Sequence, residues 1–228
     1  MFQFKQFCVH DELCAMKVGT DGVLLGAWAD VLDSRRVLDL GTGSGLIAMM
    51  VAQRNDESDI LAIDVDSGAA SQAAINFERS PWSDRLRVEL CDVRSLSSEW
   101  QFDHIVSNPP YFVETTESPS EARAIARHAR HLSVRDIVDA AERLLVEGGR
   151  LSVILPSDVA AKFRREAFER LWLVRQLDIS TKVGEPPRRT MMEFRKIASP
   201  INPHCDHITI GSAEYRALVD DFYLDNRL

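Results

Sequence analysis

The chain has 228 residues, with 27 Lys and Arg against 35 Asp and Glu, so its formal net charge is −8 at pH 7. This length fits one domain with a sizeable core, and 45% hydrophobic residues are ordinary for a globular protein. No apolar run approaches the ~20 residues that span a bilayer, and residues 1–10 lack the apolar stretch of a signal peptide. We therefore expect a cytoplasmic protein with no membrane partner. A monomer is a separate expectation, which does not rest on these observations.

The negative charge is unevenly distributed. Residues 1–113 carry 9 basic and 17 acidic side chains, whereas residues 114–228 carry 18 of each. The average acidity therefore does not exclude a nucleic-acid partner that contacts only a local basic patch. The four cysteines have no metal-binding spacing, and His204, Cys205 and His207 are interpreted as a polar turn before a strand. We expect no metal site.

Short apolar runs alternate with helical patterns over residues 37–155. This alternation predicts a parallel, doubly wound α/β sheet. After a helix at 21–31, the predicted strands are 36–40, 60–64, 86–91, 104–107 and 150–155. The predicted helices between them are 45–54, 68–80 and 134–146, and Gly148 with Gly149 is expected to end the last of these helices.

The pattern changes after residue 155. A helix at 158–170 precedes two predicted strands, 173–179 and 190–197, and a last helix covers 212–224. A long loop with two prolines joins the two strands, which predicts an antiparallel hairpin at the sheet edge. The whole is predicted to be a Rossmann-like, mostly parallel sheet of seven strands with helices on both faces. It forms a single domain, 1–228, with three parts: 1–33, 34–156 and 157–228.

Residues 39–45 read DLGTGSG, directly after the first core strand. Gly41, Gly43 and Gly45 allow a tight turn and let a ligand approach the backbone at the start of the next helix. The dinucleotide fingerprint is not met because residue 46 is Leu. With Asp39 before it, the loop instead resembles the S-adenosylmethionine loop of class I methyltransferases. The alternative is a glycine-rich turn without a ligand.

Two further acids follow neighbouring strands. Asp64 ends the second strand, where a carboxylate can accept both ribose hydroxyls of a nucleotide. Asp92 follows the third strand, where class I methyltransferases place an acid that accepts from the cofactor's adenine amino group. Either acid alone is better explained as a solvated strand end or a helix cap. Together with Asp39 and the glycine loop, they predict S-adenosylmethionine as the cofactor.

The tetrapeptide Asn108-Pro109-Pro110-Tyr111 follows the fourth strand. The Asn108 side-chain oxygen and the Pro109 carbonyl can accept both hydrogens of a planar amino group, which aims its lone pair at a methyl sulfonium. Pro109 and Pro110 fix the backbone, while Tyr111 and Phe112 offer faces on which a base can stack. The motif predicts transfer to an amino group, and it does not distinguish adenine N6, cytosine N4 or glutamine N5. The alternative is a proline-rich turn.

The chain as a whole resembles one family. Residues 7–28, 118–138 and 213–228, together with DLGTGSG and NPPY, are similar to the bacterial tRNA N6-adenosine methyltransferases that act on adenine-37 of valine tRNA. The resemblance implies the tRNA anticodon loop as partner. It also implies that Lys17, Thr20 and Asp21 lie over the methionine end of the cofactor. Thr20 and Asp21 are alternatively interpreted as the cap and first turn of a helix.

Two basic segments lie in the neutral half of the chain. The first contains Arg123 and Arg127 at helical spacing, and the second is the hairpin loop with Lys182, Arg188 and Arg189. We expect both segments to contact phosphates of the substrate, although charged runs are often only solvated surface.

Three other functions are compatible with the sequence. A glutamine N5-methyltransferase of release factors uses the same NPPY chemistry but carries a helical domain before the core. An rRNA or DNA adenine N6-methyltransferase is a second alternative, and residues 156–228 leave little room for a DNA-recognition domain. A cofactor-fold protein that only binds its ligand is the third.

Overall fold

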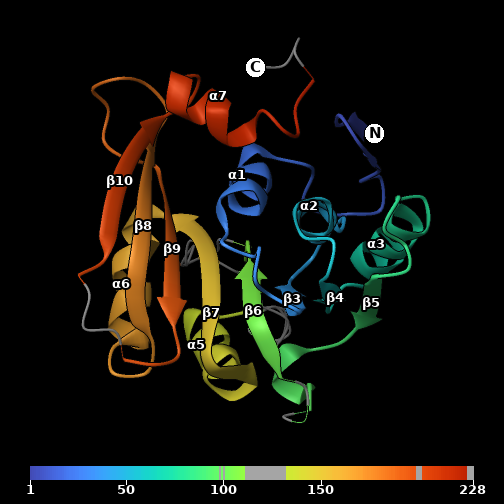
Figure 1. Cartoon of the computed structure of the whole chain (residues 1–228), viewed down its shortest axis with the longest axis horizontal. Coiled ribbons are helices and arrows are strands. Elements are labelled where there is room, and N and C mark those ends of the chain that lie inside the picture. The colour runs from blue at the N-terminus through green and yellow to red at the C-terminus, as the bar shows by residue number, and fades with distance from the viewer. Residues whose placement is uncertain (98, 100, 111–131, 199–201, 225–228) are drawn as a thin grey trace, which may run out of the picture.

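The computed structural model describes residues 1–97, 99, 101–110, 132–198 and 202–224. Within these residues, one eight-stranded sheet with the order β10-β8-β9-β7-β6-β3-β4-β5 carries helices on both faces (Figure 1). Its strands are β3 (Arg36–Leu40), β4 (Asp59–Asp64), β5 (Leu86–Leu90), β6 (Phe102–Ser107), β7 (Leu145–Pro156), β8 (Trp172–Ser180), β9 (Arg189–Arg195) and β10 (His204–Thr209). A separate antiparallel pair consists of β1 (Phe2–Gln3) and β2 (Cys8–Val9).

The strand directions gather the functional loops at one edge. β3 pairs in parallel with β4 and β6, β4 with β5, and β6 with β7. β9 runs antiparallel to both β7 and β8, so β8 again points the same way as β7, and β10 is parallel to β8. The carboxyl ends of β3 to β8 and of β10 therefore lie along one edge, which is where ligands bind in open α/β sheets.

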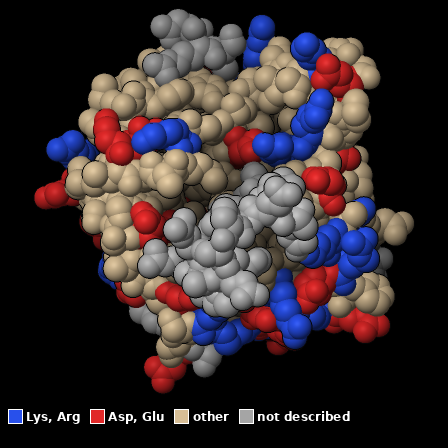
Figure 2. Space-filling model, turned by 180° about the vertical axis from the view of Figure 1, so that it is seen from behind, with Lys and Arg blue, Asp and Glu red and all other residues tan. Residues whose placement is uncertain are grey.

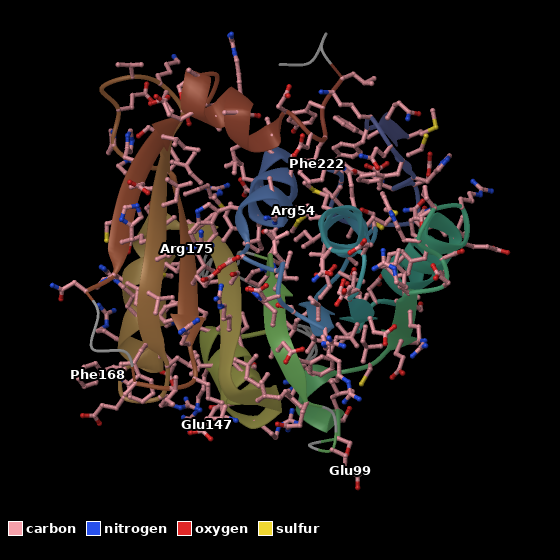
Figure 3. All side chains as sticks on the ribbon, in the orientation of Figure 1. Arg54, Glu99, Glu147, Phe168, Arg175 and Phe222 are labelled. Carbon is pink, nitrogen blue, oxygen red and sulfur yellow. The ribbon has the colours of Figure 1, made fainter. Side chains whose placement is uncertain are left out.

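Two apolar clusters pack against the two faces of the sheet. One joins α1 (Thr20–Trp28), α2 (Leu46–Arg54), α3 (Ser67–Glu78) and α7 (Ala213–Val219) to the terminal segments. The other joins α5 (Val134–Leu144), α6 (Ser157–Ala167) and the short helix η1 (Val93–Ser95). At the end of α2, Arg54 donates to the backbone oxygens of Gly26 and Ala29, at 2.9 and 2.6 Å, which ties α2 to the end of α1 (Figure 3).

The predicted doubly wound α/β architecture is confirmed, with two corrections to the sheet. It has eight described strands rather than seven, because residues 204–209 form β10 and not a turn before a strand. β10 pairs with the outer side of β8 and forms the edge of the sheet. The predicted β8–β9 hairpin therefore lies one strand inside that edge. The first four residues of β10 are exposed. Its sequence, HCDHIT, has no strict alternation of apolar and polar residues, which is the pattern that predicts a half-buried strand.

The prediction that Gly148 and Gly149 end the preceding helix is wrong. α5 ends at Leu144, and Leu145 already pairs with Phe102 in the sheet. The pairing then resumes at Arg150, so the two glycines lie in an irregularity of β7, where Gly148 has a φ of 78°. A local pattern cannot distinguish a glycine that ends a helix from one that bulges a strand, because both need a positive φ.

A buried polar network crosses the middle of the sheet. The His104 Nε2 atom lies 2.9 Å from the Ser152 hydroxyl, which donates to Glu193 Oε2 at 3.1 Å. Arg175 from β8 donates to the same Glu193 oxygen at 2.9 Å (Figure 3). The Ser152 hydroxyl has one proton and gives it to Glu193, so the His104 Nε2 must be the protonated nitrogen. Burial lowers the pKa of His104 to about 4.

This network predicts a loss of stability in acid. His104 stays neutral in the folded protein while the unfolded chain protonates near pH 6.5, so the free energy of unfolding falls as the pH drops from about 6.5 to 4, by up to about 3 kcal/mol. The His104→Gln variant should lose less stability than the wild type between pH 7.5 and 4.5 in urea unfolding. Asp39 has a raised pKa and opposes this trend, but it is common to both proteins. Parallel pH profiles for the two proteins would contradict the assignment.

Candidate functional site

A pocket opens where β3, β4, β5 and β6 end. It encloses about 850 Å³ of empty space, counting the part that is open to solvent. Most of the lining comes from the segment before α1, from the glycine loop and from the strand ends, and the rest comes from α3, η1 and the approach to α5. The lining residues are Cys14, Ala15, Met16, Leu40, Gly41, Gly43, Ile63, Asp64, Val65, Asp66, Ala69, Cys91, Asp92, Val93, Arg94, Asn108, Pro110 and Leu132. Parallel strands thus bring together groups that are far apart in the sequence.

The glycine loop forms the turn from β3 into α2. Gly41 and Gly43 line the pocket with φ angles of 77° and 57°. Gly45 is the N-cap of α2 with a φ of 81°, and a Cβ atom there would lie 2.4 Å from a ring carbon of Phe77. Only glycine fits at residue 45, because both the backbone angle and the neighbouring ring exclude a side chain. The loop presents bare backbone to the pocket.

Asp39 lies behind this loop and does not line the pocket. Its side chain is fully buried, accepts from the Thr42 hydroxyl at 2.6 Å, and accepts from the backbone N–H of Ala48 at 3.2 Å. Burial raises the pKa of Asp39 to about 7. The structure therefore places Asp39 as a support for the loop and the first turn of α2, rather than in the cofactor contact predicted from the sequence.

Asp64 lines the pocket at the end of β4, as the sequence predicted. Its two oxygens accept from the backbone N–H groups of Gly43 and Asp66, both at 2.9 Å. An ionised carboxylate has about four acceptor positions, so two remain for ligand hydroxyls. Asp66 also lines the pocket, and its side chain caps α3 by accepting from the Ala69 N–H.

Asp92 lines the pocket together with Arg94, a residue that the sequence reasoning missed. The Arg94 guanidinium donates to both Asp92 oxygens, with distances of 2.5 to 3.0 Å. These hydrogen bonds hold the pKa of the Asp92 carboxyl below its usual value. Asp92 is therefore kept ionised as an acceptor. The two-residue spacing of Asp92 and Arg94 in the sequence gave no sign of this pairing, because it depends on the turn of η1.

Asn108 and Pro110 line the pocket at the end of β6, next to the glycine loop that follows β3. Pro109 is buried and lies outside the lining. Helix α1 packs close by, because a Cβ atom at Gly22 would lie 3.9 Å from the Asn108 amide nitrogen. Tyr111 and Phe112 lie outside the described residues. The predicted stacking of a base on them stays a prediction.

Lys17, Thr20 and Asp21 do not line the pocket. The Lys17 ammonium donates to the backbone oxygen of Asp11 at 2.7 Å, and Asp21 accepts from Arg189 at 2.7 Å. Gly19, rather than Thr20, is the N-cap of α1, and Asp21 lies in its first turn as predicted. The same segment reaches the pocket through residues 14–16 instead. Burial raises the pKa of the Cys14 thiol to about 11, so Cys14 contributes an uncharged wall.

The basic loop between β8 and β9 lies on the same edge of the sheet as the pocket. Lys182 and Arg188 are exposed, whereas Arg189 pairs with Asp21 of α1. The three residues predicted to contact phosphate therefore differ. Lys182 and Arg188 are accessible to a substrate, whereas Arg189 connects the loop to the start of α1. Arg123 and Arg127 lie outside the described residues.

The described residues contain neither a group of three His, Cys, Asp or Glu side chains able to hold a metal ion nor a helix long and apolar enough to cross a membrane.

Comparisons with known proteins agree with this geometry. Residues 17–177 match the family model described as methyltransferase small domain. A Phocaeicola vulgatus protein named tRNA1(Val) (adenine(37)-N6)-methyltransferase is 46% identical, with 98% of this chain and 97% of that protein covered. A predicted O-methyltransferase of Agrobacterium tumefaciens superposes with a TM-score of 0.68 at 20% identity, covering 89% of this chain and 96% of that one. The Bradyrhizobium japonicum N-methyltransferase NodS, solved with S-adenosyl-L-homocysteine, superposes with a TM-score of 0.57 at 17% identity, covering 77% and 84%.

The fold and the pocket at the strand ends define a class I methyltransferase. The chain belongs to the family of the tRNA1(Val) (adenine(37)-N6)-methyltransferases, within the wider methyltransferase small domain family. The resemblance stated from the sequence is confirmed.

Proposed function

We propose that the protein transfers a methyl group from S-adenosylmethionine to the N6 amino group of adenine-37 in the anticodon loop of valine tRNA. The observation that carries the proposal is the position of Asn108. The first residue of NPPY lines the same pocket as the glycine loop, Asp64 and Asp92. The name of the Phocaeicola vulgatus relative, which matches over nearly the full length, supports this nucleoside and this tRNA.

The pocket fits the proposed cofactor. Asp64 has acceptor positions left for ribose hydroxyls, and Asp92 is held ionised by Arg94 to accept from an adenine amino group. The bare backbone at Gly41 and Gly43 lets the ligand approach closely. S-adenosylmethionine supplies a methyl group on a positively charged sulfur, which a weak nucleophile attacks only when it is well placed.

Asn108 supplies that placement from the pocket lining, and the backbone oxygen of Pro109, a residue outside that lining, is the second acceptor that the motif predicts. Their oxygens accept the two N6 hydrogens, so the nitrogen lone pair turns out of conjugation with the ring and points at the methyl group. The same acceptors stabilise the positive charge that develops on nitrogen during transfer. After the transfer, the methylated N6 group is positively charged and readily loses a proton to water. The reaction therefore requires no strong base. Most of the rate enhancement then comes from holding two substrates in line.

The substrate assignment is tested with isotopically labelled S-adenosylmethionine. Purified protein is incubated separately with unmodified valine tRNA, total ribosomal RNA and release factor, and mass spectrometry locates the methyl group. We expect N6-methyladenosine at position 37 of the tRNA. Label on a release-factor glutamine, with none on tRNA, would overturn the proposal in favour of the glutamine N5 alternative. A valine tRNA with guanosine at position 37 is the matched control and should receive no methyl group.

The exposed arginine of the β8–β9 loop should contribute to tRNA binding. Positive and negative side chains are interspersed over the face seen from behind (Figure 2), so we expect affinity to depend on local contacts. Arg188→Ala should weaken tRNA binding and reduce the slope of log K against log salt by about one, while cofactor binding stays unchanged. Arg165→Ala removes a charge from α6 that is also exposed, and this variant is the control. Equal salt slopes for both variants would exclude the loop.

A further inference from the structure

Residues 10–16, here called the strap, connect β2 to the approach to α1 and contain no helix or strand. Three consecutive strap residues, Cys14, Ala15 and Met16, line the pocket. A segment without regular structure has backbone N–H and C=O groups that need other partners. The position of this pocket wall therefore depends on what binds the strap backbone.

A row of residues along α3 supplies several of these partners. Gly68, Gln72 and Asn76 are spaced by four residues, so they share one face of the helix. A Cβ atom at Gly68 would lie 2.7 Å from the Leu13 carbonyl oxygen, so the missing side chain lets the strap approach the helix. The Gln72 side-chain oxygen accepts from the Leu13 N–H at 3.1 Å.

Asn76 connects the strap to the glycine loop. Its oxygen accepts from the His10 N–H at 3.0 Å, and its amide nitrogen donates to the His10 oxygen at 2.7 Å and to the Ser44 oxygen at 2.8 Å. Asn76 is only 1% exposed. One buried amide thus links the start of the strap to the glycine loop, and each of these two segments lines the pocket through its neighbouring residues.

We propose that Gln72 and Asn76 are positioning residues for the cofactor: they hold the strap as a wall of the pocket without touching the ligand. This inference rests on the proposed binding of S-adenosylmethionine at that pocket. When either amide is removed, the strap is held in place in only a fraction of the molecules. The apparent dissociation constant then rises in inverse proportion to that fraction.

The chain offers a matched control in Asn55. This buried asparagine also holds loop backbone, because its amide nitrogen donates to the oxygens of Val31, Leu32 and Ser34 at 2.7, 3.2 and 2.8 Å. It follows the last residue of α2, at the opposite end of that helix from the glycine loop. Asn55→Ala should lower stability as Asn76→Ala does, without moving the strap.

The first measurement is binding of S-adenosyl-L-homocysteine to the full chain by calorimetry. We expect a dissociation constant about tenfold higher for Asn76→Ala and about threefold higher for Gln72→Ala, and little change for Asn55→Ala. In steady-state assays, Asn76→Ala should raise KM for the cofactor and leave kcat at saturation nearly unchanged. Gln72→Ala removes only one hydrogen bond to the strap. It therefore provides the test of the positioning role if Asn76→Ala does not fold.

The second measurement is tryptic cleavage after Lys17, the exposed residue that follows the strap. Asn76→Ala should be cleaved faster than the wild type, and S-adenosyl-L-homocysteine should slow the cleavage, because the ligand contacts the wall that the strap provides. Asn55→Ala should be cleaved after Lys17 at the wild-type rate.

Equal dissociation constants for Asn76→Ala and Asn55→Ala, in a wild type that binds the ligand, would overturn the positioning role and leave the proposed function intact. If the ligand does not slow cleavage after Lys17, the positioning role is also overturned and the proposed function is left intact. A wild type that does not bind S-adenosyl-L-homocysteine would overturn both proposals.

Discussion

Asn108→Ala is expected to lower kcat by about 10²–10³, because it removes an acceptor that acts on the amino group as positive charge develops there. The side chain lines the pocket at the end of β6, next to the glycine loop. Cofactor binding should change little, since the strap, the glycine loop, Asp64 and Asp92 all remain. The measurement is single-turnover methylation of valine tRNA, with cofactor affinity determined separately by calorimetry.

Asn108→Asp is the matched variant. It keeps one acceptor oxygen and replaces the amide nitrogen with a second, charged oxygen, so its rate should lie between those of the wild type and Asn108→Ala. A large loss of cofactor affinity in Asn108→Ala would contradict the role assigned to this residue. It would show that Asn108 serves the cofactor rather than the amino group.

Asp64→Ala is expected to weaken cofactor binding by about a hundredfold, since hydrogen bonds to a charged group contribute about 1.5–3 kcal/mol each. The variant loses the proposed acceptor for the ribose hydroxyls. It also frees the Gly43 N–H, which donates to Asp64 at 2.9 Å and fixes the glycine loop. Calorimetry with S-adenosyl-L-homocysteine measures the effect directly.

Asp59→Ala provides the control for this change. Asp59 begins β4, the strand that Asp64 ends, and it is exposed at the far edge of the sheet. The two variants remove the same charge from the same strand. If both bind the ligand with wild-type affinity, Asp64 is a structural residue of the loop and not a cofactor ligand.

The strand ends were predictable because the signal for them is local. DLGTGSG combines an apolar strand, its last acid and a turn that only glycine can make, all within seven neighbouring residues. Asp64, Asp92 and NPPY each follow an apolar run, so the alternation of strands and helices already predicted that they meet at one edge. The pocket confirms this meeting for Asp64, Asp92, Asn108 and Pro110. Their roles in binding and transfer stay predictions.

Other features of the fold and of the site were not predicted correctly, because they depend on contacts between residues that are distant in the sequence. Asp39 belongs to the same motif as the glycines, yet the loop folds over it and separates it from the pocket. Arg189 was expected at a phosphate, but α1 places Asp21 within 2.7 Å of it. β10 was missed because its sequence, HCDHIT, has no strict alternation of apolar and polar residues.

The sequence by itself predicted the cofactor and NPPY motifs and the alternation of strands and helices that brings them to one edge, because motifs and periodicity are properties of neighbouring residues. Only the tertiary structure decided which residues support the site and which line it. Asn76 shows the reason most clearly: its amide is an ordinary polar side chain in the sequence, and it becomes a link between strap and glycine loop only when α3 packs between them. Such a role arises from the three-dimensional position of backbone groups, which no local pattern encodes.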